Sequence, residues 1–190
     1  VFFVSTCVYV ALAQAKYVYY PDRQLAATPA AVGLVFEDVA VTTEDGETID
    51  GWFVPSYTGG ESAEHTILFC HGNGGDMGDR IVSLQTFNRL GCNTLIFDYR
   101  GYGESTGAPT EDGTYKDVLA CWDYLVDERG LRPGSLVVFG RSLGGGLASW
   151  LAAPANPGAL VLDSTFASAP ALAAIMFPFL PPSLFCRFQS

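Results

Sequence analysis

Basic residues are scarce in this chain, and their scarcity narrows the range of partners. Among 190 residues there are 10 Lys and Arg against 20 Asp and Glu, so the formal net charge is −10 at pH 7. A nucleic-acid backbone is held by clustered Lys and Arg side chains. The sequence therefore argues against a nucleic-acid partner. Its 49% of hydrophobic residues, at this length, predict one domain with a sizeable core rather than a disordered segment.

Closely spaced cysteines are also absent. The five cysteines stand at positions 7, 70, 92, 121 and 186, and no two of them are separated by only two residues. Structural zinc sites and disulfide frameworks both rely on close, regular spacings of this kind. We therefore expect no metal, no cofactor and no disulfide framework in this protein.

The N-terminal residues contain no charged side chain before Lys16. As a helix, the run VFFVSTCVYVALAQA would reach about 22 Å at ~1.5 Å per residue, which is less than the ~30 Å hydrocarbon core of a bilayer. The run has no polar face, which a helix packed on a protein core would show. We interpret residues 1–19 as a membrane anchor or signal remnant whose beginning is absent, and predict membrane association on a side that is left open. A helix or strand packed on the domain is the alternative.

Strand and helix patterns alternate from residue 34 onward. Two strands, at 34–42 and 48–54, flank a Glu-Asp-Gly turn and predict an antiparallel hairpin. Short apolar runs that are typical of buried parallel strands follow at 66–70, 93–97, 135–139 and 159–162. Helix patterns lie between them, at 79–90, 111–129 and 143–152. The order predicts an α/β fold: a mostly parallel sheet with an N-terminal antiparallel hairpin, helices on both faces, and the run 159–162 at its edge.

One motif at a strand-to-helix junction carries the chemistry. Residues Gly140-Arg141-Ser142-Leu143-Gly144 follow a strand pattern and precede a helix pattern. In that context G-x-S-x-G is typical of a nucleophile elbow, where the serine sits on a tight, strained turn with its hydroxyl above the sheet. Gly140 and Gly144 are expected where strand and helix approach too closely for a side chain. The N–H of Leu143, at the positive end of a helix dipole, would face the reacting carbonyl. An ordinary Gly/Ser turn is the alternative.

A glycine-rich loop, His71-Gly72-Asn73-Gly74-Gly75, directly follows the first short apolar run. This is the position of an oxyanion loop, whose glycines let backbone N–H groups turn toward a developing negative charge. The N–H of Asn73 is then the second donor of the oxyanion hole. A loop that merely connects strand to helix is the alternative. A phosphate-binding loop is disfavoured, because no Gly-Lys-Ser/Thr ends it and no G-x-G-x-x-G can be completed.

Five separated runs together resemble a known family. They are TILFCHGNGGD, NTLIFDYRGYGES, the helix pattern at 111–129, LVVFGRSLGGG and LVLDSTFAS. From residue 20 to its last residue the chain resembles the α/β-hydrolase superfamily, and within it the membrane-anchored serine hydrolases grouped with serine aminopeptidase-like and depalmitoylase-like α/β-hydrolase-domain proteins. The resemblance implies Ser142 as the nucleophile, the N–H groups of Asn73 and Leu143 as the oxyanion hole, and a lid after Ser164.

The same resemblance exposes a departure from the family's pattern. In this fold the catalytic triad runs Ser, then Asp or Glu, then His, but His65 and His71 both precede Ser142 and the chain ends at Ser190. We expect His71 to brace its loop and His65 to lie on the surface. A serine hydroxyl without a base is a weak nucleophile. We therefore expect the chain to be a severely impaired catalyst that lacks the last strands of the sheet and continues beyond residue 190.

Asp163 has two interpretations. Some hydrolases of this fold take their triad acid from this position, whereas an acidic residue here would otherwise hydrogen-bond the start of the lid. We favour the second, since an acid without a histidine to orient contributes nothing. Asp98 and Arg100, in the run FDYRGYGES, are interpreted as a pair that braces a turn.

The C-terminal residues suggest the kind of substrate. From residue 167 the chain is apolar and broken by Pro178, Pro181 and Pro182, which a core helix would not tolerate. We divide the chain into the apolar segment 1–19, a hydrolase core 20–166 and the start of a lid, 167–190. A lid of this composition fits a small acyl or lipid-like substrate. A core segment beneath absent strands is the alternative.

Three functions remain in competition. The first is a serine hydrolase that cleaves an ester, thioester or amide bond through an acyl-Ser142 intermediate. The second is a non-catalytic binding module of the same fold, consistent with the absent base. The third, a nucleotide-binding Rossmann-type protein, lacks both the glycine fingerprint and the acidic residue downstream of it. We predict the hydrolase, and the sequence leaves its oligomeric state open.

Overall fold

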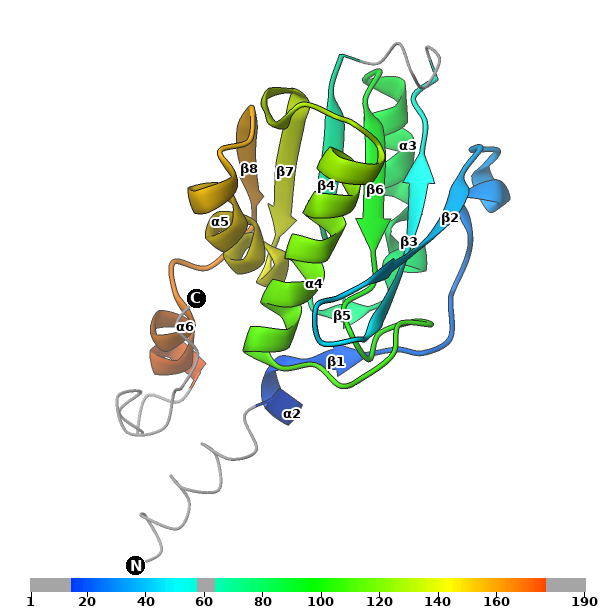
Figure 1. Cartoon of the computed structure of the whole chain (residues 1–190). Helices are drawn as coiled ribbons and strands as arrows, with labels where there is room; N and C mark the ends of the chain where they lie inside the picture. Colours follow the sequence, from blue (N-terminus) through cyan, green and yellow to red (C-terminus); the bar gives the residue numbers. More distant parts are fainter. Residues whose placement is uncertain (1–14, 58–63, 177–190) are drawn as a thin grey trace, which may run out of the picture.

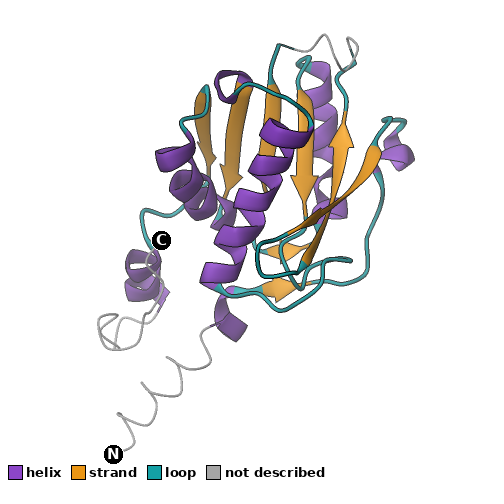
Figure 2. Cartoon of the chain, viewed as in Figure 1, coloured by secondary structure: helices purple, strands orange, loops and turns teal. Residues whose placement is uncertain are grey.

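The described part of the chain is built on one six-stranded sheet with helices on both faces (Figure 1). The structure is a computed structural model, and it describes residues 15–57 and 64–176. Figure 2 shows the strands in orange between helices in purple. The predicted α/β fold with a mostly parallel sheet is confirmed.

The strands of this sheet stand in the order β2-β3-β6-β4-β7-β8. In that order they span Glu37–Thr42, Thr48–Val54, Asn93–Phe97, Thr66–Cys70, Leu136–Arg141 and Ala159–Asp163. The pairs β2–β3 and β3–β6 are antiparallel, whereas β6, β4, β7 and β8 run parallel to one another. The carboxyl ends of the parallel strands therefore share one edge, so the loops after β4 and β7 meet there.

Strands β2 and β3 form the predicted antiparallel hairpin. The turn between them contains Gly46 at φ 87°, in the left-handed region that glycine adopts without a steric cost. The hydroxyl of Thr43 donates to Asp45 Oδ1 at 2.7 Å and holds the turn. The first strand begins at residue 37 rather than 34, because the N–H of Leu34 is bonded to the carbonyl of Pro29 in the preceding 3-10 turn.

The two faces of the sheet bury different helices. Leu68 and Cys70 of β4 belong to the apolar cluster that packs against α4 (Glu111–Asp123) and α5 (Leu143–Ala155). Ile67 and Phe69, which alternate with them along β4, face the opposite cluster, beneath α3 (Ile81–Arg89). Successive side chains of a strand point to opposite faces. The continuous apolar runs of the sequence therefore arise because this sheet is covered on both sides.

The helix predicted at 79–90 differs at both of its ends. It begins as a 3-10 turn, Met77–Arg80, and becomes α-helical from residue 81 to residue 89. Leu84 and Phe87 are buried, as expected from their spacing. Leu90 is 71% exposed, because α3 ends before it and Gly91, at φ 79°, turns the chain toward β6.

The longest helix pattern, 111–129, contains a change of helix type. The hydroxyl of Thr110 accepts a hydrogen bond from the N–H of Gly113 at 3.0 Å and caps α4. Beyond residue 123 the helix widens into a π-helical turn, Tyr124–Glu128. Helix α5 runs to residue 155, past the predicted end at 152.

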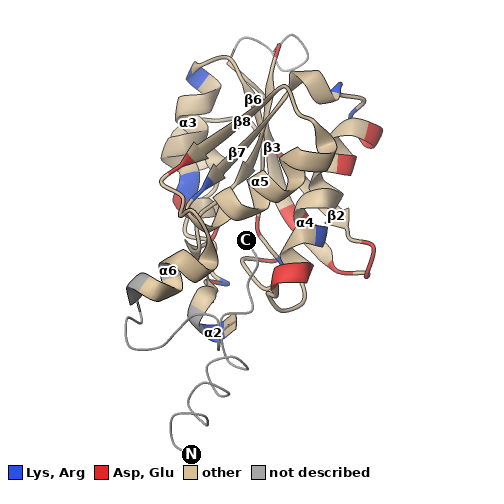
Figure 3. Ribbon diagram, turned by 90° about the vertical axis from the view of Figure 1, so that its left-hand side faces the viewer, with Lys and Arg blue, Asp and Glu red and all other residues tan. Residues whose placement is uncertain are grey.

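Strand β8 forms the edge of the sheet, as predicted. Its Leu160, Val161 and Leu162 are 41%, 40% and 46% exposed. Helix α6 (Ala169–Met176) follows and carries no charged residue (Figure 3). The rest of the predicted lid, residues 177–190, lies outside the described residues.

The described N-terminal residues pack on the domain. In α2 (Ala15–Val18) the side chains of Ala15 and Val18 contact the apolar cluster under α4 and α5. Strand β1 (Tyr20–Pro21) then pairs in parallel with β5 (Gly74–Gly75). Within 15–57 and 64–176, no helix is both long and apolar enough to cross a membrane. Residues 1–14 of the predicted anchor lie outside these ranges, so membrane association stays a prediction.

Candidate active site

Ser142 sits at the junction between β7 and α5 in a strained backbone conformation. Its φ and ψ are 52° and −116°, a combination that a non-glycine residue keeps only when its surroundings enforce it. The N–H of Ser142 donates to the carbonyl of Asp163 at 3.0 Å. Its own carbonyl accepts from the N–H of Gly145 at 3.0 Å and from the hydroxyl of Thr165 at 2.8 Å. These bonds hold the turn from β8, from the segment just after it and from α5.

The two motif glycines stand where the packing leaves no room for a side chain. A Cβ on Gly140 would lie 2.5 Å from the carbonyl oxygen of Gly144 and 2.6 Å from the Cβ of Ala148. A Cβ on Gly144 would overlap the carbonyl oxygen of Cys70 and lie 2.6 Å from that of His71. The first turn of α5 thus rests directly on the ends of β4 and β7. The close approach that the sequence predicted at both glycines is present.

The loop after β4 lies beside Ser142. A Cβ on Gly72 would be 3.6 Å from the Cβ of Ser142 and 3.7 Å from the carbonyl oxygen of Arg141. The two segments meet because Cys70, the last residue of β4, pairs with Gly140 near the end of β7. Glycine-rich loop and strained serine therefore face each other across a short gap at the carboxyl edge of the sheet.

His71 holds the peptide group on which the expected Asn73 donor depends. Its ring is fully buried, and Nδ1 lies 2.7 Å from the carbonyl oxygen of Gly72. A carbonyl only accepts hydrogen bonds, so Nδ1 carries the proton. The guanidinium of Arg80 donates to the same carbonyl at 3.4 Å. Because a trans peptide is planar, fixing the Gly72 carbonyl on one side directs the N–H of Asn73 to the other.

The other ring nitrogen of His71 is enclosed as well. Nε2 lies 3.1 Å from Oδ1 of the buried Asp98, although not in a hydrogen-bonding orientation. The same Oδ1 accepts from the N–H of Met77 at 2.8 Å, and the Tyr99 ring lies against the imidazole at 4.5 Å between centroids. His71 is therefore unable to reach the hydroxyl of Ser142 as a base.

His65 is exposed and precedes β4, at the opposite edge of the sheet from Ser142. It too is out of reach of the serine hydroxyl. Neither histidine of the chain is thus placed to act as its base. The position of both follows from the topology, since β4 and β7 run parallel and their beginnings and ends lie at opposite edges.

Two backbone N–H groups next to the gap have no acceptor in the described part of the chain. The N–H of Leu143 is the first of α5 and has no partner within the helix, and neither it nor the N–H of Asn73 donates to another residue in the described part of the chain. The side chain of Asn73 makes other contacts. Its Oδ1 accepts from the hydroxyl of Tyr102 at 2.9 Å and from the N–H of Tyr20 at 3.1 Å.

Asp163 is paired with a neighbour on the adjacent strand. Arg141 Nε donates to its Oδ2 at 2.7 Å, and the hydroxyl of Ser164 donates to its Oδ1 at 2.9 Å. These two hydrogen bonds, the one from Arg141 foremost, hold the pKa of Asp163 below its ordinary value. Arg141 also donates to the hydroxyl of Ser83 at 3.0 Å, which ties the elbow to α3. Asp163 thus joins β8 to the elbow.

The predicted pair of Asp98 and Arg100 is wrong. Asp98 faces His71, whereas Arg100 donates to Asp117 of α4 at 2.9 Å and to Asp45 of the hairpin turn at 2.9 and 3.0 Å. Both residues lie beyond the end of β6 at Phe97, so the two-residue repeat of a strand does not place their side chains on one face. Arg100 instead joins the hairpin to α4.

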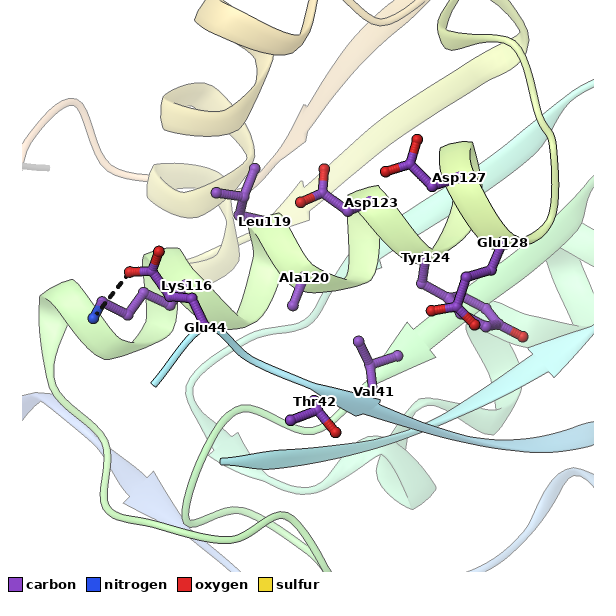
Figure 4. Close-up of a pocket in the computed structure, with 10 residues that line it drawn as sticks. All are labelled: Val41, Thr42, Glu44, Lys116, Leu119, Ala120, Asp123, Tyr124, Asp127 and Glu128. Atoms are coloured by element: carbon purple, nitrogen blue, oxygen red, sulfur yellow. Dashed lines mark ion pairs between the residues drawn. The ribbon is translucent and has the colours of Figure 1, made fainter. Parts of the chain in front are cut away.

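A pocket of about 210 Å³ lies elsewhere, between β2 and α4 (Figure 4). Its lining residues are Val41, Thr42, Glu44, Lys116, Leu119, Ala120, Asp123, Tyr124, Asp127 and Glu128. Lys116 pairs with Glu44 at 3.1 Å, and burial together with the charge of Asp127 raises the pKa of Asp123. No residue of the elbow or of the loop after β4 lines it. Within the described ranges, no three His, Cys, Asp or Glu side chains could hold a metal ion.

Comparison with known proteins shows the family of this chain. A family model described as alpha/beta hydrolase fold matches residues 65–188. The chain belongs to this family. The matched region begins just before β4, so it includes the glycine-rich loop and the Ser142 turn.

Curated relatives and solved structures extend the likeness. The chain is 36% identical over 168 residues to an uncharacterized protein of Mycobacterium tuberculosis, covering 88% of the chain and 59% of that protein. It is 35% identical over 175 residues to the alpha/beta hydrolase domain-containing protein WAV2 of Arabidopsis thaliana, covering 88% and 56%. Among solved structures, the Pyrococcus furiosus esterase Pf2001 matches with a TM-score of 0.67 and 25% identity, over 90% of the chain and 68% of the esterase. The chain thus spans less than two thirds of these curated relatives.

Proposed function

We propose that this protein is a serine hydrolase that cleaves an ester, thioester or amide bond through an acyl-Ser142 intermediate. The single observation that supports this most is the strained turn at Ser142, whose Cβ lies 3.6 Å from where a Cβ on Gly72 would stand. The N–H groups of the adjoining Asn73 and Leu143 donate to no residue within the described ranges. The strained backbone at Ser142 costs free energy, and such strain is found mostly at functional sites. Here we propose that the strained turn raises the Ser142 hydroxyl above the sheet.

The proposed reaction follows from this placement. The Ser142 oxygen adds to the substrate carbonyl carbon, and the carbonyl oxygen becomes an oxyanion that accepts hydrogen bonds from Asn73 and Leu143. The positive end of α5, a helix of 13 residues, adds to this stabilisation. The leaving group departs with a proton, and water then releases the acyl group from the serine.

The proton acceptor for Ser142 is the part of this mechanism that the described residues do not supply. His71 is buried between Gly72 and Asp98, and His65 is at the far edge of the sheet. We therefore propose that a protein limited to these 190 residues turns over poorly, and that full activity needs a histidine from outside them. A non-catalytic binding module is the second candidate. The observation that favours it is that both ring nitrogens of His71 are enclosed, one at the Gly72 carbonyl and the other beside Asp98.

The substrate proposal rests on composition around the site. Helix α6, which follows β8 and the Asp163-Ser164-Thr165 turn, is uncharged and rich in alanine. An apolar cover of this kind suits an acyl chain rather than a charged peptide. The structural likeness to an esterase supports an ester substrate class. Hydrolysis of p-nitrophenyl esters of increasing acyl length should favour the medium or long chains, and a preference for acetate would remove the acyl-chain proposal.

The proposed nucleophile is tested by Ser142→Ala in the full-length protein. We expect ester hydrolysis to fall by at least about 10³-fold, as when a catalytic serine is removed elsewhere. Ser149→Ala is the matched control, because Ser149 lies in the same helix and its hydroxyl only bonds the carbonyl of Gly145 at 2.8 Å. A fluorophosphonate should label the wild-type protein at Ser142 and nowhere else. Undiminished hydrolysis by Ser142→Ala would leave the binding module as the better account.

A further inference from the structure

A short N-terminal segment is bonded to the loop that carries Asn73. We call residues 19–22 the strap. Within it, β1 pairs in parallel with β5, so that Tyr20 stands opposite Gly74 and Pro21 opposite Gly75. The N–H of Asp22 adds a bond to the carbonyl of Gly75 at 3.3 Å. The strap thus extends the loop into a two-stranded sheet immediately after Asn73.

Tyr102 closes the contact between strap and loop. Its hydroxyl donates to Asn73 Oδ1 at 2.9 Å and accepts from the N–H of Tyr20 at 3.1 Å. That N–H also lies 3.1 Å from Asn73 Oδ1, so three residues far apart in sequence meet at one carbonyl oxygen. The Tyr102 side chain is fully buried, and burial raises the pKa of its hydroxyl, which therefore stays protonated as a donor.

The strap is itself fixed to the rest of the molecule. Tyr19 is 4% exposed, belongs to the cluster under α4 and α5, and its hydroxyl lies 3.4 Å from that of Thr114 in α4. At the other end, the carbonyl of Asp22 accepts from the N–H of Gly103 at 2.8 Å. The loop is therefore tied to an element that the core already holds in place.

The loop needs such support because of its glycines. Gly72, Gly74 and Gly75 surround Asn73, and glycine gives up more conformational freedom on ordering than any other residue. His71 and Arg80 fix the peptide before Asn73, and Arg80 also donates to the carbonyl of Gly74. The side chain of Asn73 itself is held by Tyr102 and by the N–H of Tyr20. An oxyanion donor is effective only if it is already oriented when the charge develops.

We infer that Tyr102 and the strap position the oxyanion loop, by tethering the side chain of Asn73 so that its backbone N–H stays directed at the reacting carbonyl. Tyr102 is then a positioning residue that acts through Asn73 and does not touch substrate. This inference rests on the proposed hydrolase function. If the inference holds, the turnover rate also depends on the strap near the N-terminus.

Tyr102→Phe tests the tether in the full-length protein. The ring contact with His71 is kept, and only the hydroxyl is lost. We expect kcat to fall about tenfold with KM nearly unchanged, less than the ~10²–10³ lost with an entire oxyanion donor. Tyr115→Phe is the matched control, since that hydroxyl bonds Glu111 on α4, away from the loop. An unchanged kcat in Tyr102→Phe would overturn the inference, as would an equal fall in both variants.

A double-mutant cycle separates a tether from general stabilisation. Asn73→Ala keeps the backbone N–H but removes the oxygen that Tyr102 and Tyr20 bind. If the tether acts through this oxygen, Tyr102→Phe should lower kcat in the wild type and have no further effect in Asn73→Ala. Additive losses in kcat would show that Tyr102 acts by another route and would overturn the inference.

Two measurements keep this inference distinct from the proposed function. Amide hydrogen exchange of the segment 72–76 does not depend on activity, and it should be faster in Tyr102→Phe than in Tyr115→Phe. Removing residues 1–14 leaves the strap intact and should preserve kcat, whereas removing residues 1–22 should lower it. Unchanged exchange in Tyr102→Phe would overturn the tether even if Ser142 proves to be the nucleophile. If Ser142→Ala keeps full activity while exchange rises in Tyr102→Phe, the loop is tethered but the proposed function fails.

Discussion

The turn at Ser142, at the end of β7, and the neighbouring strand β8 differ in how closely other residues pack against them. At the elbow, the backbone of Ser142 is bonded on both sides and the neighbouring glycines are in contact with β4. One strand further, β8 leaves three consecutive apolar side chains about half as exposed as in an extended chain, between 40% and 46%. Within the described residues, the Ser142 turn is thus held by several contacts at once, while β8 beside it is exposed. The close packing of the Ser142 turn thus comes from the centre of the sheet, while two of its hydrogen bonds come from β8 and from Thr165 just after it, at the edge.

The largest expected effect is at the elbow. Gly144→Ala places a methyl group against the carbonyl oxygens of Cys70 and His71, and neither main chain can move without disturbing β4. We expect a loss of about 3 kcal/mol in the free energy of unfolding, measured in urea. Gly134→Ala is the control, because nothing lies within 4 Å of its Cβ, and it should cost less than about 0.5 kcal/mol. A comparable cost at both sites would refute the close packing described here.

A pair of identical substitutions compares the two strands directly. Val138 of β7 is fully buried, whereas Val161 of β8 is 40% exposed. In a protein of these 190 residues, Val138→Ala should cost about 2 kcal/mol of unfolding free energy and Val161→Ala less than half of that. If Val161→Ala and Val138→Ala cost the same unfolding free energy in the full-length protein, other residues must cover β8 in that protein. Equal costs in the 190-residue chain would contradict the exposed edge.

The smallest expected effect concerns Asp163, which joins the two regions. Its pKa is lowered in the fold by Arg141 and Ser164, so its contribution to stability is present above the ordinary value of 3.8 and is lost as the pH falls through the lowered pKa. Asp163→Asn should therefore lower the stability slightly at neutral pH, where the charged carboxylate contributes, and should have no effect at a pH below the lowered pKa of Asp163. The same variant should keep ester hydrolysis within about tenfold of the wild type, because a triad acid would cost ~10⁴-fold. A loss of that larger size would make Asp163 the triad acid after all.

Local patterns in the sequence predicted the elements well, and the reason is physical. Apolar runs flanked by glycine marked β4 and β6 at their observed bounds, because a strand buried on both faces has no polar positions. Gly140 and Gly144 predicted a close approach that the packing shows. Element ends were predicted less well. Leu90 continues the helical spacing of its neighbours, yet it lies beyond the end of α3, because Gly91 turns the chain toward β6 before another turn can form.

The contacts that hold the site could not be predicted in the same way. Tyr102 meets Asn73 across 29 positions of sequence, and Arg100 meets Asp45 across 55. Such pairs depend on which strands are neighbours, and the sequence gives no local signal for that order. The run FDYRGYGES showed that its polar residues mattered, but it did not show which partner each would find. The strap was missed for the same reason: Tyr19 was assigned to the apolar segment 1–19 and residues 20–22 to the core, and neither assignment predicted a partner in the loop after β4.

The most direct test of the account is a crystal structure of the full-length protein after reaction with an alkyl phosphonate ester. We predict a covalent bond between phosphorus and the Ser142 oxygen, with one phosphonyl oxygen about 2.7–3.1 Å from the backbone nitrogens of both Asn73 and Leu143. An adduct on another residue, or a phosphonyl oxygen that faces away from these two nitrogens, would contradict it.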